Sequence, residues 1–261
     1  MNIHNTFKLL NNRCAFIPFI TAGDPSLEIT EIALSILDQE GADIIEVGLP
    51  YSDSLADGPI IQAAAERALR KGITINSILK LLEKKIPQIS APIVIFSYYN
   101  IILNYEQTQF IKELNRIGVK GLLVPDLPIE EAEKIIQICN NYNIELILLV
   151  SPTSSIDRIH KIAEKTQGCL YLVSSTGVTG IRKEFKSDLK KLIYTIKQIT
   201  NKPIIVGFGI SNEEQVKDIK STGSNGIVIG SALVKLLSET KNSEDTHNFE
   251  TFCKQIKLAT R

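Results

Sequence analysis

Two carboxylates, Glu46 and Asp57, have the residue type and the surroundings needed for proton-transfer chemistry. Glu46 interrupts the apolar segment 44–49, and the alternation of side chains along a strand places it on one face with Ile44 and Gly48. Burying an unpaired carboxylate is costly, and such groups cluster at active sites. A buried acid with a raised pKa can transfer protons at neutral pH, whereas an ionised carboxylate can stabilise a developing positive charge.

Both carboxylates also have ordinary structural interpretations. Asp57 precedes Gly58 and Pro59, and proline favours the first turn of a helix, so Asp57 could cap the helix that follows. Glu46 could form an ion pair with a buried arginine or lysine. The local pattern leaves these alternatives open.

The elements that must position these residues repeat along the chain. Short apolar segments alternate with segments of helical periodicity, which predicts a parallel sheet with helical crossovers. Eight strands favour an α/β fold of the (β/α)8 TIM-barrel type, with a doubly wound open sheet as the alternative. We expect an extra N-terminal helix over residues 3–12, a polar loop over 238–248 before a last helix, and one domain spanning 1–261. The predicted strands lie within 16–21, 44–49, 93–98, 121–126, 145–150, 169–173, 203–209 and 226–231.

Glycine clusters follow the last predicted strands, at the end of a barrel where active sites form. Residues 207–211 and 230–232 lie where such barrels often bind phosphate, and Ser231 could both begin a helix and donate to an oxyanion. A third cluster covers 175–180. These glycines could instead serve only tight turns. No histidine lies at a predicted strand end, which argues against a zinc site or a Ser-His-Asp triad, and Lys183 is the one candidate for a Schiff base.

The composition excludes several classes of function. Lys+Arg and Asp+Glu are both 29 in 261 residues, so there is no basic field for nucleic acid or a membrane surface. The apolar runs are too short to span a bilayer, and the N-terminal residues lack the apolar core of a signal peptide. The 4 cysteines form no CxxC pair, which predicts reduced thiols and no metal site. We expect a soluble intracellular protein. Its richness in Ile, Asn and Lys would fit a cytoplasmic protein, or a plastid stromal protein from an AT-rich plastid genome.

One segment resembles a known family closely. Residues 45–62, IEVGLPYSDSLADGPIIQ, are similar to the signature of the α-subunit family of tryptophan synthases. PFITAGDP (18–25), VPDLP (124–128), STGVTG (175–180) and GFGIS (207–211) are further pieces of that family, in its order. Ser54 departs from the pattern, because the family usually has proline there, and this bears on the rigidity of the loop.

The resemblance implies a lyase that cleaves indole-3-glycerol phosphate to indole and glyceraldehyde 3-phosphate in tryptophan biosynthesis. It implies that Glu46 and Asp57 are catalytic, that no metal or organic cofactor is needed, and that the partner is a pyridoxal-phosphate β subunit in an α2β2 heterotetramer. Two alternatives remain: a sugar-phosphate isomerase or epimerase of the same fold, and a non-catalytic activator of a partner. The implied substrate-contacting positions are Gly180, Gly209, Gly230 and Ser231 at the phosphate, Phe19, Tyr98, Leu123 and Phe208 at the indole, Tyr171 near the carboxylates, and Thr179 in a mobile lid.

Overall fold

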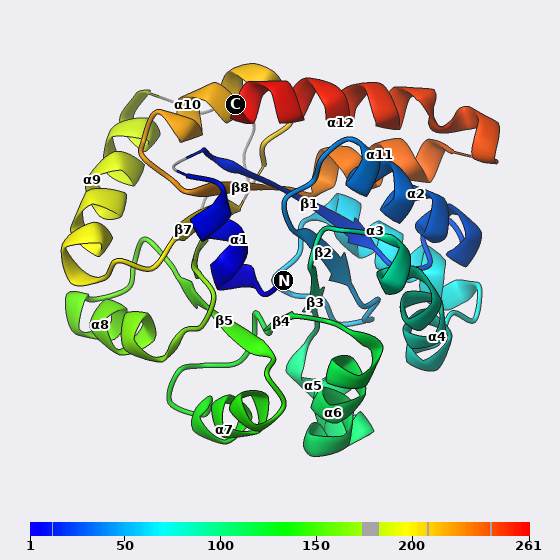
Figure 1. Cartoon of the computed structure of the whole chain (residues 1–261), viewed down its shortest axis with the longest axis horizontal. Helices are drawn as coiled ribbons and strands as arrows, with labels where there is room; N and C mark the ends of the chain where they lie inside the picture. Colours follow the sequence, from blue (N-terminus) through cyan, green and yellow to red (C-terminus); the bar gives the residue numbers. More distant parts are fainter. Residues whose placement is uncertain (12, 174–182, 208, 241) are drawn as a thin grey trace.

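A closed barrel of eight parallel strands forms the centre of the molecule (Figure 1). The computed structural model describes residues 1–11, 13–173, 183–207, 209–240 and 242–261. Each strand overlaps a predicted segment, and β8 pairs with β1 to close the ring, so the barrel prediction is confirmed and the open-sheet alternative is wrong. The strands are β1 (Ala15–Thr21), β2 (Ile45–Gly48), β3 (Ile93–Phe96), β4 (Gly121–Leu123), β5 (Glu145–Val150), β6 (Leu170–Val173), β7 (Ile204–Gly207) and β8 (Gly226–Ile229).

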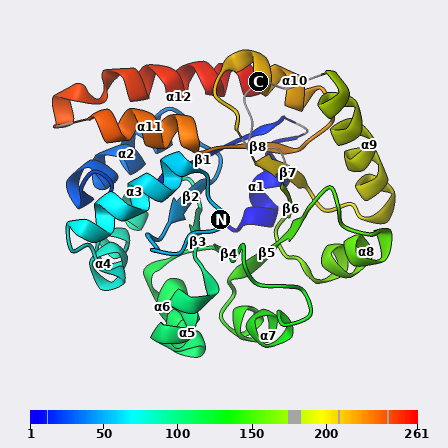
Figure 2. The ribbon, with the colours of Figure 1, turned by 180° about the vertical axis from the view of Figure 1, so that it is seen from behind.

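Helices surround the barrel, as both views show (Figures 1 and 2). Within the part of the chain that the structure describes, no helix is long and apolar enough to cross a membrane. The outer helices are α2 (Leu27–Gln39), α3 (Pro59–Arg70), α4 (Ile75–Lys85), α5 (Tyr99–Tyr105), α6 (Gln107–Ile117), α7 (Glu133–Asn141), α8 (Ile156–Lys165), α9 (Lys183–Ile199), α10 (Glu213–Lys220), α11 (Ser231–Glu239) and α12 (His247–Thr260), with short 3-10 turns at Ile86–Gln88 and Ser243–Thr246.

Helix α5 and the turn Ser243–Thr246 were not predicted. Helix α5 begins after Tyr98, which makes no side-chain cap. Its first amide, that of Tyr99, is instead bound by the Asp126 carboxylate at 2.9 Å, from the loop after β4. A cap supplied from a different strand leaves no local signal in the sequence. The predicted polar loop 238–248 is shorter in the structure, because α11 continues to Glu239 and the 3-10 turn Ser243–Thr246 lies within the predicted loop.

The apolar residues form two layers that follow the alternation predicted for the strands. On β2, Ile45, Val47 and Leu49 pack outward against the helices. Ile44 packs inward with the residues that fill the barrel. Glu46 and Gly48 alternate in the same sense, so they too face the barrel interior. The predicted division of faces on this strand is confirmed.

The predicted N-terminal helix forms as α1 (Ile3–Leu9), which ends before residue 12 and covers one end of the barrel (Figure 1). Ile3, Phe7 and Leu10 join the residues that fill the barrel. The amide of Ile3 donates to the Glu145 carboxylate at 2.6 Å, at the beginning of β5. This helix therefore closes the amino-terminal end and leaves the carboxyl end of the strands for the site.

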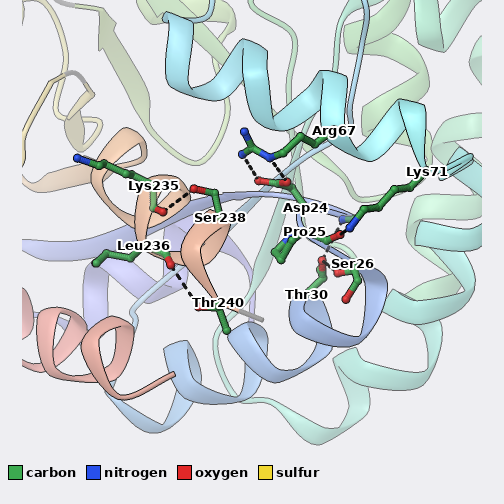
Figure 3. Close-up of polar contacts among 11 residues, drawn as sticks. Asp24, Pro25, Ser26, Thr30, Arg67, Lys71, Lys235, Leu236, Ser238 and Thr240 are labelled. Atoms are coloured by element: carbon green, nitrogen blue, oxygen red, sulfur yellow. Dashed lines mark hydrogen bonds and ion pairs between the residues drawn. The ribbon is translucent and has the colours of Figure 1, made fainter. Parts of the chain in front are cut away.

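An ion pair fixes α3 to the loop after β1 (Figure 3). The Arg67 guanidinium donates to both oxygens of Asp24, from Nε at 2.8 Å and from the terminal nitrogen at 2.7 Å. Asp24 is only 2% exposed, and Lys71 donates to the neighbouring carbonyl of Pro25 at 2.7 Å. Asp24, one of the carboxylates that follow predicted strands, is therefore held as a structural group.

We expect Arg67→Met to lower the free energy of unfolding by about 2–3 kcal/mol, because it leaves the buried Asp24 carboxylate unpaired; the half-exposed position of Arg67 reduces the cost of breaking such a pair. Urea unfolding measures the change. Arg70→Met is the matched control, since Arg70 forms an exposed pair with Glu66 on the same helix, worth at most about 0.5 kcal/mol. Equal losses in the two variants would contradict the structural role of Asp24.

Candidate active site

Glu46 is a buried acid without a hydrogen-bonding partner. It is 1% exposed, and neither of its carboxyl oxygens meets a donor or acceptor among the described residues. Its neighbours across the sheet are Phe19 on β1 and Val94 on β3. Burial raises the pKa of Glu46 to about 8, because the ionised form loses its hydration. No described arginine or lysine pairs with Glu46, so at neutral pH it holds a proton that it can donate.

Asp57 is held by Tyr98 from the end of β3. The amide of Ala56 donates to the Tyr98 hydroxyl at 3.1 Å, and that hydroxyl therefore gives its one proton to Asp57 Oδ2 at 3.0 Å. Burial raises the pKa of Asp57 to about 6, and the bond from Tyr98 acts in the opposite direction. Asp57 is thus mainly ionised at neutral pH, as predicted, although its carboxyl is better shielded from water than its polar loop indicates.

The capping interpretation of Asp57 is wrong. Helix α3 begins at Pro59 with Gly58 as its N-cap, and no side chain caps it. The Asp57 carboxyl points instead to Tyr98, whose position lies 41 residues further along the chain. Because Asp57 serves no helix, its carboxyl is available for chemistry.

Two glycines make room for aromatic rings inside the barrel. A Cβ on Gly48 would lie 2.5 Å from Cζ of Phe19, and one on Gly207 would overlap the Tyr171 hydroxyl. Tyr171 is buried, and burial followed by the charges of Glu46 and Asp57 raises its pKa well above the ordinary value. Its hydroxyl therefore stays protonated beside the two acids and can act as a donor.

Aromatic rings form a continuous apolar wall next to the carboxylates. Phe19 meets Phe96 edge-on with centroids 5.4 Å apart, Phe96 meets Tyr98 at 6.0 Å, and Tyr98 meets Tyr51 at 5.2 Å. Leu123 lies in the same interior layer. Three further half-buried residues face the barrel interior and were not predicted as part of the site: Phe96, Leu149 and Val173. The alternation of side chains along their strands could have identified them.

The predicted phosphate positions follow β7 and β8 at the same end of the barrel. Gly209 has a φ of +52°, a conformation that other residues rarely adopt, and no atom of the described residues lies within 4 Å of a Cβ built on it. Ser231 begins α11, whose N-cap Gly230 provides no side-chain bond, so the first amides of this helix have no side-chain acceptor at the cap. Thr179, Gly180 and Phe208 lie outside the described residues, as does the predicted lid 175–180.

The other polar candidates have structural partners. Asp53 accepts from Ser52 at 2.8 Å, and Asp126 holds the start of α5. Lys202 donates to three carbonyls at the end of α8. The side chain of Lys183, the Schiff-base candidate, is not described. In the described ranges no group of three or more His, Cys, Asp or Glu residues could hold a metal ion.

Comparison with known proteins agrees with this geometry. Residues 7–261 match the family model described as tryptophan synthase alpha chain. The alpha chain of Pyropia yezoensis is 54% identical over 98% of both chains, and that of Synechocystis sp. is 49% identical over 97% of both. A tryptophan synthase structure from Mycobacterium tuberculosis superposes with a TM-score of 0.90 at 31% identity, covering 99% of this chain and 98% of that one. A chain of the Pyrococcus furiosus a2b2 complex gives 0.87 at 36% identity, covering 94% and 98%. The chain therefore belongs to the tryptophan synthase alpha chain family.

Proposed function

We propose that Glu46 and Asp57 catalyse the carbon–carbon lyase reaction of this family, the cleavage of indole-3-glycerol phosphate to indole and glyceraldehyde 3-phosphate in tryptophan biosynthesis. The observation that carries the proposal is the pairing of two unlike acids. Glu46 is buried, unpaired and protonated at neutral pH, and Asp57 is mainly ionised and held in place by Tyr98. When their environments give two acids different pKa values, one acid can donate a proton while the other stays ionised and stabilises positive charge.

The two acids divide the reaction as follows. Glu46 gives its proton to C3 of the indole ring, and positive charge develops at the ring nitrogen. The ionised Asp57 stabilises that charge through the ring N–H. Glu46, now a carboxylate, takes the proton of the hydroxyl on the side-chain carbon that is bonded to C3. The bond between C3 and this side-chain carbon then breaks. Its electrons return to the ring, and the side-chain carbon becomes the aldehyde of the product. Glu46 ends protonated, ready for another cycle.

The rest of the site supports substrate binding. Phe19, Leu123 and Tyr98 provide an apolar surface for the indole ring, and Tyr171 provides a hydroxyl donor beside the acids. Gly180, Gly209, Gly230 and Ser231 would bind the phosphate. Phe208 would border the indole, and Thr179 would belong to the lid. Support for this placement comes from two features of the described residues: the start of α11 has no side-chain cap, and no described atom lies near a Cβ built on Gly209.

The partner in this proposal is a tryptophan synthase β subunit, in an α2β2 heterotetramer whose pyridoxal phosphate belongs to the β subunit. Support comes from the Pyrococcus furiosus structure described as an a2b2 complex. The whole chain, 1–261, acts as one barrel domain without a cofactor of its own. Its compartment is the cytoplasm, or the plastid stroma, as its composition and its similarity to a protein of the red alga Pyropia yezoensis favour.

Indole release tests the function. We expect the purified chain to release indole from indole-3-glycerol phosphate, and to do so faster when the cognate β subunit is present. The two chains should also co-elute in size-exclusion chromatography. Activity on a sugar phosphate alone would favour the isomerase or epimerase alternative. An activated β subunit without indole release would favour the non-catalytic alternative. Absence of both co-elution and a rate change would count against the partner.

We expect Gly230→Val to raise KM for indole-3-glycerol phosphate by about tenfold or more, because it places a branched side chain at the phosphate end of the site, and loss of one or two bonds to a charged group has about that size. Its Cβ would lie 3.3 Å from Phe19, a contact that small ring movements can relieve, so the fold should persist. The measurement is a steady-state indole assay with circular dichroism as the folding check. Unchanged KM in a folded variant would contradict the phosphate assignment.

A further inference from the structure

Gln62 lies one turn into α3 and reaches back to the loop that carries Asp57. Its side-chain nitrogen donates to two main-chain carbonyls of that loop, Ser54 at 3.1 Å and Asp57 at 3.0 Å. Both neighbours are acceptors, so the nitrogen and not the oxygen of the amide must face them. Each proton of the nitrogen therefore binds one carbonyl, that of Ser54 at the start of the turn and that of Asp57 at its end.

The bonds of Gln62 matter because the tip of this loop is exposed. Leu55, at its tip, is 90% exposed, and Ser52 and Asp53 are exposed too. Among the described residues, the main chain of the loop contributes two bonds, from the Leu55 amide to the Asp53 carbonyl at 2.8 Å and from the Asp57 amide to the Ser54 carbonyl at 3.0 Å. Ser54 stands where the family usually has proline, so the backbone at this position lacks the restriction on φ that a proline ring would impose.

Gln62 and Tyr98 act on opposite sides of Asp57. Tyr98 binds the carboxyl and also the amide of Ala56, while Gln62 binds the carbonyl of the same aspartate. Without Gln62, the Asp57 carbonyl loses this bond, and the loop is fixed on one side only, by Tyr98 and by the bond from the Asp57 amide to Ser54. The peptide that follows Asp57 can then rotate, which would turn the carboxyl away from Tyr98 and toward water. A misplacement of about 1 Å is enough to cost a large part of a catalytic rate.

We propose that Gln62 is a positioning residue for Asp57, which it fixes through the two carbonyls of the loop that carries this aspartate. The inference rests on the proposed catalytic role of Asp57. It concerns a side chain that does not touch the substrate and acts only through the loop carbonyls.

The test substitutes methionine, which matches glutamine in length and in helix propensity but cannot donate. We expect Gln62→Met to lower kcat for indole release by about tenfold, the size of losing one or two neutral hydrogen bonds, with KM changed by no more than about twofold. The acidic limb of the kcat/KM profile should move from about pH 6 toward the ordinary aspartate range, because burial, the main cause of the raised pKa of Asp57, is relieved. Tyr98 and Tyr171, which interact with this carboxyl, stay protonated in this range because their pKa values are raised, and so does Glu46, whose pKa is about 8.

Glu66→Met is the matched control, since Glu66 lies one turn further on the same helix and its one ion pair among the described residues is an exposed pair with Arg70. It should keep the wild-type kcat and acidic limb. A Gln62→Met enzyme with wild-type kcat would overturn the inference. So would a loss of kcat that only follows the folded fraction, with the acidic limb unchanged. Wild-type protein that releases no indole would overturn the proposed function instead, so the two failures are distinguishable.

Discussion

Glu46→Gln should lower kcat for indole release by at least about 10²–10⁴-fold, the range typical for loss of a general acid–base group. Glutamine keeps the shape of the side chain but cannot move a proton. KM should change little, because the proposed contacts to phosphate and indole remain. The measurement is a steady-state indole assay on purified protein, and near-normal turnover would show that Glu46 is structural.

The stability of the same variant separates chemistry from misfolding. The pKa of Glu46 is about 8 in the folded chain, above the ordinary value near 4.5. Between these two pH values the unfolded chain releases the proton and the folded chain keeps it, so wild-type stability falls as pH rises through this window. Glu46→Gln lacks this effect. Urea unfolding should therefore show equal stability near pH 4 and a growing advantage of the variant up to pH 8. A variant less stable at neutral pH would indicate that misfolding causes its loss of activity.

Asp57→Asn should lower kcat by about 10²–10³-fold, because it removes a charge aimed at the developing positive charge on the ring. The asparagine oxygen can still accept the proton of Tyr98, so the loop should keep its position and KM should change little. An electron-withdrawing ring substituent destabilises the same positive charge. It should therefore slow Asp57→Asn more than it slows the wild type, as measured with substituted substrates. Equal sensitivity in the two enzymes would contradict the electrostatic role.

The position of Glu46 could be predicted because strand alternation is local: one apolar segment of β2 determines which side chains face inward. Its lack of a partner could not be predicted, since any arginine or lysine of the chain could have faced it. The structure excludes this among the described residues, because the described ion pairs all involve other acids, such as Asp24 with Arg67.

The surroundings of Asp57 could not be predicted for a related reason. The cap signal before Gly58 and Pro59 is local, whereas its actual partner, Tyr98, comes from a neighbouring strand. Tyr98 was expected to line the indole, and its bond to Asp57 gives it a second role that no spacing indicates. The start of α5 depends in the same way on Asp126 from the next strand. Long-range hydrogen bonds of this kind decide which polar residues remain free for chemistry.

The most direct test of the paired acids is the pH dependence of kcat/KM for indole release by the wild-type chain. The active form has Asp57 ionised and Glu46 protonated, with pKa values of about 6 and about 8. The profile should therefore be bell-shaped, rising with a midpoint near pH 6 and falling with a midpoint near pH 8. The rising limb should disappear in Asp57→Asn. A wild-type rate that stays at its plateau from pH 8 to well above pH 9, in protein that remains folded, would contradict the proton transfer assigned to Glu46.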